Sequence, residues 1–136
     1  MADEDRTLEE LEGCDSGEPE TAATPMIARC MRLQKTPLRA LSDADLRLLI
    51  SQGIGLKYLV LRAIERLTVE PLLQTDYYPG DLLDTLLRIE RNYWLQNPTE
   101  LHWFRSVATQ VARRYGKVVR DCEDFLATDH NDDSRQ

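Results

Sequence analysis

The chain has 136 residues, of which 42% are hydrophobic and 30% are charged, and its formal net charge is −7. This length predicts a single domain with an apolar core and a water-exposed surface. The charge disfavours free nucleic acid as a direct partner of the whole chain, because the phosphates would be repelled. No membrane span is expected either, because the longest apolar run covers only residues 58–61.

Hydrophobic residues recur at the spacing of an α-helix along most of the chain, and no long stretch alternates with the period of two that a strand requires. Residues that favour the start or the end of a helix divide this pattern into separate helices. Thr7 begins a short capping box, Ser42 precedes Asp45 in a second one, and prolines at positions 37 and 71 end helices. The longer predicted helices cover about residues 26–35, 42–52, 55–69, 81–96 and 98–126. We therefore predict an all-α protein, a compact bundle of about five helices with acidic, flexible termini.

Acidic residues gather at the two ends of the chain. Residues 1–20 hold nine acidic residues and one basic residue, and residues 121–136 hold six and one. Solvated tails are the simplest interpretation. We expect an acidic, partly disordered N-terminal segment over residues 1–24, a helical domain over 25–126 and an acidic tail over 127–136. The alternative is an acidic surface that steers a basic partner towards the protein.

Two glycine-containing segments separate the apolar helices. The first is a tight turn whose glycines we interpret as backbone devices that let two helices meet closely, and not as ligand contacts. The second follows a pair of tyrosines and ends in an aspartate, which is expected to cap the next helix and to interact with its dipole. The residues of these two motifs are Gln52, Gly53 and Gly55, and Pro79, Gly80 and Asp81.

The chain offers few groups for catalysis or for metal binding. His102 lies early in the last predicted helix, and nothing would position His130 in its polar tail. No nucleophile-elbow, zinc-protease or Walker pattern occurs, and the acidic run 129–133 lacks the glycine and the later glutamate of a calcium loop. The cysteines at positions 14, 30 and 122 are too widely spaced for a metal knuckle, which favours reduced thiols in the cytoplasm. We predict no enzyme activity, no cofactor and no metal.

The segment 46–67 also has the layout of a DNA-binding helix-turn-helix unit. Its second helix carries Lys57, Arg62 and Arg66, but few of the Asn, Gln or Ser side chains that read bases. A small DNA-binding regulator is therefore the alternative function.

Several of these segments together resemble the immunity proteins of bacterial contact-dependent growth inhibition (CDI) systems. The family pattern L-E-E-L-E-G and G-E-P stands here at Leu8–Gly13 and Gly17–Pro19. Its D-L-R-x-L-I-x-Q-G-I-G-L-x-Y-L-V segment stands at Asp45–Val60, and Y-P-G-D-L-L at Tyr78–Leu83. The chain departs from the pattern where it has Leu61 in place of a frequent proline, and where Ser16 replaces a favoured tryptophan.

The resemblance implies an antidote that is made beside a secreted toxin. Such a protein binds the C-terminal domain of its cognate toxin in the cytoplasm and blocks the active site. These toxins are commonly nucleases, and they are often basic because they grip phosphates. The implied partner is therefore a basic nuclease domain, with no direct nucleic acid and no membrane, and we expect the isolated antidote to be a monomer or a weak dimer.

Two acidic surfaces are candidates for binding the toxin. At the end of the last helix, carboxylates oppose the helix dipole, an arrangement that local stability does not favour. The loop before residue 81 combines aromatic anchors with negative charge, although a purely structural role is its alternative reading. The candidate residues are Asp121, Glu123 and Asp124 at the helix end, and Asp76, Tyr77, Tyr78 and Asp84 at the loop.

Overall fold

A computed structural model describes residues 2–115 and 120–128. In these ranges the chain forms eight α-helices and three 3₁₀ turns, and no β-strand beyond an isolated bridge between Gln74 and Pro79. The all-α prediction is confirmed. The α-helices are α1 (Leu8–Glu12), α2 (Pro25–Gln34), α3 (Asp43–Ser51), α4 (Leu56–Val69), α5 (Asp81–Leu87), α6 (Arg91–Gln96), α7 (Pro98–Tyr115) and α8 (Arg120–Ala127). The 3₁₀ turns are η1 (Ala2–Asp5), η2 (Pro19–Thr21) and η3 (Leu38–Ala40).

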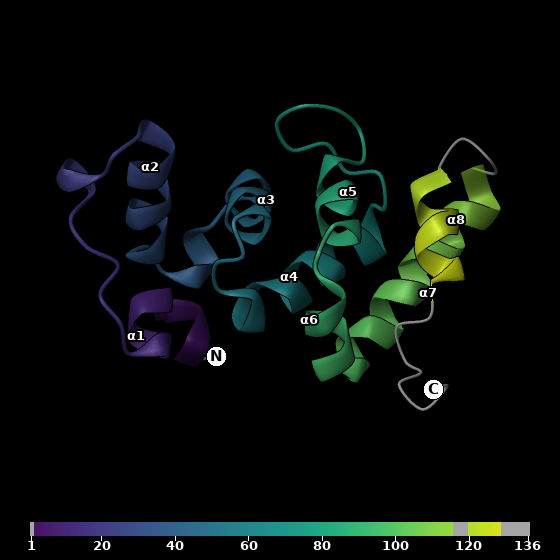
Figure 1. The fold of residues 1–136 in the computed structure, drawn as a ribbon, viewed down its shortest axis with the longest axis horizontal. Helices are drawn as coiled ribbons and strands as arrows, with labels where there is room; N and C mark the ends of the chain where they lie inside the picture. The colour runs from purple at the N-terminus through teal and green to yellow at the C-terminus, as the bar shows by residue number, and fades with distance from the viewer. Residues whose placement is uncertain (1, 116–119, 129–136) are drawn as a thin grey trace.

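The helices succeed one another along the long axis of the molecule, with α1 and α2 at one end and α7 and α8 at the other (Figure 1). Helix α4 lies in the middle and packs against α3, α5 and α7. Its inward face is almost completely buried, because apolar residues recur there every three or four positions. These core residues are Leu59, Val60, Ala63, Ile64 and Leu67. No helix within the described ranges is long and apolar enough to cross a membrane.

Two predicted helices are each divided in the structure. The helix expected over residues 81–96 ends at Leu87 and restarts at Arg91, so that α6 can bury Trp94 completely. The helix expected over 98–126 is wrong as a single element, because α8 packs against α7. Phe125 of α8 thereby meets the ring of Phe104 edge-on, with centroids 5.1 Å apart. In one continuous helix these two residues would lie roughly 30 Å apart.

The acidic N-terminal segment packs against the helical body. Leu8 of α1 is fully buried. Glu9 accepts a hydrogen bond from the Lys35 ammonium at 2.8 Å and Asp5 pairs with Arg39 at 2.6 Å. Hydrogen bonds from Lys35 and from Ser16 lower the pKa of Glu9 to about 2. Two of the N-terminal carboxylates are therefore paired with cations from the segment that follows, at the end of α2 and on η3.

The turn between α3 and α4 has two glycines with different surroundings. Gly53 follows α3 with φ +72°, and the Ile54 N–H bonds the Leu49 carbonyl at 2.9 Å, as in a Schellman motif. A Cβ added at Gly53 would meet nothing within 4 Å. Gly55 has φ +67°, and a Cβ there would lie 2.8 Å from both terminal methyl carbons of Leu8. Gly55 thus allows the close approach between α1 and the start of α4.

Because of this difference, Gly53→Ala and Gly55→Ala are expected to lower the free energy of unfolding by different amounts. Gly53→Ala should lower the free energy of unfolding by about 1–2 kcal/mol through its left-handed backbone alone. Gly55→Ala should cost about 1–3 kcal/mol more, because Leu8 must also move. Urea denaturation of both variants, followed by circular dichroism, measures the difference. Equal losses would show that the contact with Leu8 is not tightly packed.

Candidate functional site

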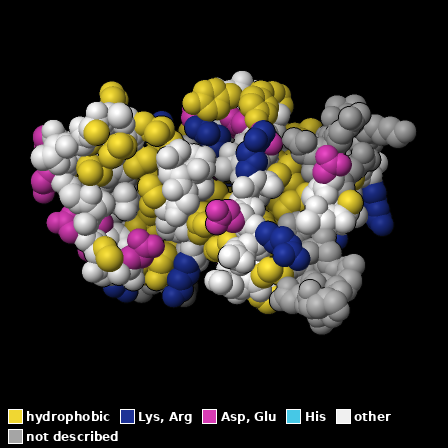
Figure 2. All heavy atoms as spheres, viewed as in Figure 1, with side chains coloured by type: hydrophobic (Ala, Val, Ile, Leu, Met, Phe, Trp, Pro, Cys, Tyr) yellow, Lys and Arg dark blue, Asp and Glu magenta, His cyan; other side chains and the backbone are white. Residues whose placement is uncertain are grey.

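The loop between α4 and α5 carries two exposed aromatic side chains. We call residues 74–80 the tyrosine loop; it rises above α5 (Figure 1). Tyr77 is 68% exposed and Tyr78 is 46% exposed. Figure 2 shows hydrophobic side chains gathered at this edge of the molecule, with charged side chains of both signs directly beneath them. Two adjacent exposed rings on one loop, close to charged side chains, mark a candidate binding site.

Asp81 fixes the backbone of the tyrosine loop. Its side chain is buried, with a residue exposure of 2%. One carboxylate oxygen accepts from the Thr75 N–H at 2.8 Å. The other accepts from the Thr75 hydroxyl at 2.8 Å and from the N–H groups of Asp76 and Tyr77, both at 2.9 Å. Burial raises the pKa of Asp81, but these hydrogen bonds outweigh it and lower the pKa to about 2.

This arrangement differs from the expected role of Asp81. The residue was expected to cap α5, whereas the N-cap position is Gly80 and no side chain caps the helix there. Asp81 occupies the first helical position, and its carboxylate turns back to the preceding loop. Its hydrogen bonds therefore stabilise the loop conformation instead of the helix terminus.

Arg47 of α3 supports the loop from the side of the core. Its guanidinium carbon lies 4.7 Å from the centroid of the Tyr77 ring, and its Nη2 lies 3.6 Å from a carboxylate oxygen of Asp76. The Arg47 side chain is only 12% exposed. Sequence reasoning missed this residue, although one signal was present. Arg47 is a lone cation within the apolar run 46–50, which is unusual unless a partner covers it.

Tyr78 is held by a second contact. Its hydroxyl donates to the carboxylate of Asp84 on α5, and this hydrogen bond raises the pKa of Tyr78. Arg88 pairs with the same carboxylate at 3.3 Å. The structure therefore brings together the four predicted residues of the loop and of α5, with Arg47 behind Asp76 and Tyr77 and Arg88 beside Asp84.

The other candidate surface is described only in part. Asp124 is exposed on α8, while the side chains of Asp121 and Glu123 lie outside the described residues. The polar contacts of the tyrosine loop come from α3 and α5, and Asp124 takes no part in them. His102 is exposed on α7, and His130 and the acidic run 129–133 fall outside the described ranges. The part of the chain that the structure describes contains no cluster of three potential metal ligands.

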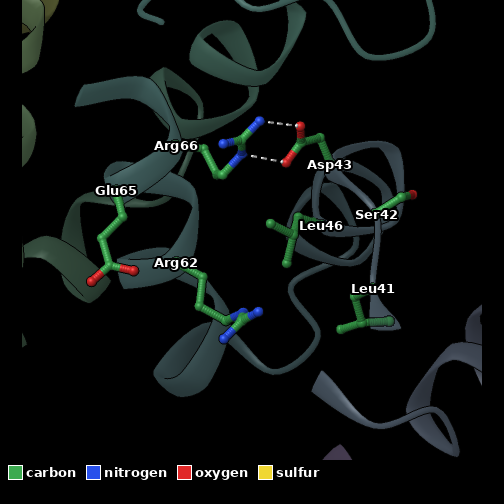
Figure 3. Close-up of a pocket in the computed structure, with 7 residues that line it drawn as sticks. All are labelled: Leu41, Ser42, Asp43, Leu46, Arg62, Glu65 and Arg66. Carbon is green, nitrogen blue, oxygen red and sulfur yellow. Dashed lines mark hydrogen bonds and ion pairs between the residues drawn. The ribbon is translucent and has the colours of Figure 1, made fainter. Parts of the chain in front are cut away.

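A cleft of about 380 Å³ lies between α3 and α4. Figure 3 shows Arg66 reaching across it to Asp43, in a two-point ion pair with distances of 2.9 and 3.0 Å, while Glu65 points away. Arg62 pairs with Glu4 of η1. Two of the cations that a DNA-reading helix would need are thus paired within the protein, and the opposite face of α4 forms the core. This arrangement disfavours the DNA-binding alternative.

Comparison with known proteins places these features in a family. The family model of CDI immunity proteins matches residues 10–103. The match runs from α1 into α7 and includes the turn at Gly53, the whole tyrosine loop and Asp81. No curated protein and no solved structure matches the chain significantly. Because the family model covers more than half of the sequence, the chain belongs to the family of CDI immunity proteins.

Proposed function

We propose that this immunity protein binds the C-terminal domain of its cognate CDI toxin in the cytoplasm and blocks it through the tyrosine loop. Family membership supports an antidote that acts on a toxin, and not an enzyme. The proposal rests on one observation: two exposed tyrosines lie on a loop whose backbone is held by hydrogen bonds to Asp81.

Tyrosine is well suited to such a surface. It buries a large area in a partner, retains a polar hydroxyl and loses little conformational entropy on binding. A loop that is held before binding also reduces the ordering cost of association. Tyr77 and Tyr78 therefore have the properties of interface hot spots.

The proposed class of toxin rests on the family first and on the charge of this chain second. The chain carries a formal net charge of −7, which complements a basic partner. The resemblance to CDI immunity proteins implies a toxin that is commonly a nuclease, and nucleases are often basic because they grip phosphates, so a basic nuclease domain is the toxin class that we propose. Blocking by occupation of its surface requires one antidote molecule for each toxin molecule, and protection should therefore saturate at an equimolar ratio.

Alanine substitutions at the two tyrosines test the binding surface. The probe is the C-terminal toxin domain encoded beside the gene of this protein. Tyr77→Ala and Tyr78→Ala should each weaken binding by about 2 kcal/mol, or roughly 30-fold in Kd, because hot-spot rings leave unfilled pockets in the partner. Isothermal titration calorimetry at constant salt measures the affinities. Trp103→Ala is the matched control, since Trp103 is also 46% exposed but lies on α7.

Unchanged affinity for both tyrosine variants would contradict the proposed surface. The end of α8 is then the remaining candidate. Reversal of Asp121, Glu123 and Asp124 to Lys would slow association at low salt if this end steers the toxin.

A further inference from the structure

We infer that Arg47 is a positioning residue for toxin binding, which holds the ring of Tyr77 in the orientation that the toxin recognises. The inference rests on the proposed function of the tyrosine loop, and it adds a residue that lies behind the contact surface. Arg47 itself is largely covered, so it acts through Tyr77 and not through a direct contact with the toxin.

The geometry divides the support of the loop between two residues. Asp81 binds the backbone N–H groups of residues 75–77 and the Thr75 hydroxyl. Arg47 instead contacts side chains: its guanidinium carbon lies over the Tyr77 ring, 4.7 Å from the centroid, and its Nη2 pairs with the Asp76 carboxylate at 3.6 Å. Removal of the guanidinium should therefore release the ring while the loop backbone keeps its conformation.

The burial of Arg47 would be unfavourable for folding if the residue only filled space in the core. It stands on α3 among buried leucines, and its Nε is buried without a hydrogen-bond partner. A buried, incompletely paired cation usually contributes less to folding than an apolar side chain of similar volume. The described contacts of the Arg47 guanidinium are with Asp76 and Tyr77, so its role is to hold side chains of the tyrosine loop.

The chemistry of the contact also requires an arginine. A planar guanidinium can stack on an aromatic face and pair with a carboxylate at its edge at the same time. A lysine ammonium keeps the charge but loses the flat stacking surface. Arg47→Lys should therefore retain the attraction to Asp76 and lose part of the restraint on the ring.

A double-mutant cycle between Arg47 and Tyr77 tests the inference with the same toxin domain. Arg47→Met keeps the apolar stem, and it should weaken binding about tenfold if the competent ring orientation falls to about a tenth of the molecules. In the Tyr77→Ala background, the same change should cost no further affinity, because the ring through which it acts is absent. Arg62→Met is the control and should leave the affinity unchanged, because Arg62 also has a buried Nε without a hydrogen-bond partner but pairs with Glu4 of η1 and not with the loop.

A measurement without toxin provides an independent readout. The NMR signals of the Tyr77 ring should shift towards those of a freely rotating tyrosine in Arg47→Met, and partly so in Arg47→Lys, while the amide signals of 75–77 keep their positions. If Arg47→Met does not fold, Arg47→Lys carries the same test with a smaller expected effect.

The outcomes separate the inference from the proposed function. Equal affinity losses from Arg47→Met in the wild-type and Tyr77→Ala backgrounds would overturn the inference, because they indicate a role outside the ring. Loss of affinity in Tyr77→Ala with none in Arg47→Met would overturn it too, and would leave the tyrosine loop as the binding surface. Unchanged affinity in Tyr77→Ala alone would also overturn the inference, whereas unchanged affinity in both Tyr77→Ala and Tyr78→Ala would refute the proposed surface itself.

Discussion

Asp81→Ala is expected to lower the free energy of unfolding by about 3 kcal/mol at pH 7, because it removes a charged acceptor from four donors. Water can replace part of this loss, since Asp76 and Tyr77 are exposed. Urea denaturation measures the change. Asp84→Ala is the control on the same helix, and it should cost only about 1 kcal/mol, because the Tyr78 hydroxyl and the Arg88 guanidinium that it releases are both exposed to water. A loss for Asp81→Ala no larger than that of the control would show that the loop does not depend on this carboxylate.

The same carboxylate predicts a dependence on pH. Its pKa falls from an ordinary 3.8 to about 2 in the folded protein. Its ionised form therefore stabilises the fold above about pH 4, and this contribution is lost as the pH falls through about 2. The stability difference between wild type and Asp81→Asn should be constant near neutral pH and should shrink in acid. Comparison with Asp81→Asn is needed because Glu9 also has a lowered pKa and loses its contribution over the same range.

Trp94→Ala is expected to lower the free energy of unfolding by about 3–5 kcal/mol. Trp94 is fully buried, stacks on Phe104 at a centroid distance of 5.2 Å and meets Phe125 edge-on at 5.9 Å. Its loss would leave a cavity at the junction of α6, α7 and α8. Thermal and urea denaturation, followed by circular dichroism, measure the change.

Trp94→Phe separates packing from polarity at this position. The indole N–H of Trp94 is buried without a hydrogen-bond partner. Phenylalanine removes that donor and keeps a ring that can stack on Phe104, so it should cost less than half as much as alanine. Equal costs for the two variants would mean that the larger indole ring, and not the aromatic stack, stabilises this part of the core.

Local signals in the sequence identify most helix boundaries. Ser42 forms the capping box that starts α3, and Gly53 takes the left-handed backbone that ends it. These features depend on residues a few positions apart, so a sequence pattern can reveal them. The divided helices could not be predicted in the same way, because the burial of Trp94 and the contact of Phe125 with Phe104 join distant segments.

The contacts of the candidate site could be predicted from the sequence only in part, for the same reason. Tyr77, Tyr78 and Asp84 are visible as an aromatic and acidic loop, but Arg47 lies 30 positions before Tyr77 and meets it only through the packing of α3 beside α5. Asp81 has two sets of N–H donors within reach, those of the following helix and those of the preceding loop. Sequence cannot decide between them, because the choice depends on how the loop folds over the helix terminus.

The fixed conformation of the tyrosine loop has a consequence for the speed of protection. A toxin that is an enzyme damages its target with every turnover, so an antidote must intercept it early. When a binding surface has to rearrange first, the association rate falls below the value that diffusion and charge allow. Asp81 holds the loop in the free protein. If the toxin binds at the surface proposed above, the loop needs no prior rearrangement, and the association rate should be set by diffusion and charge.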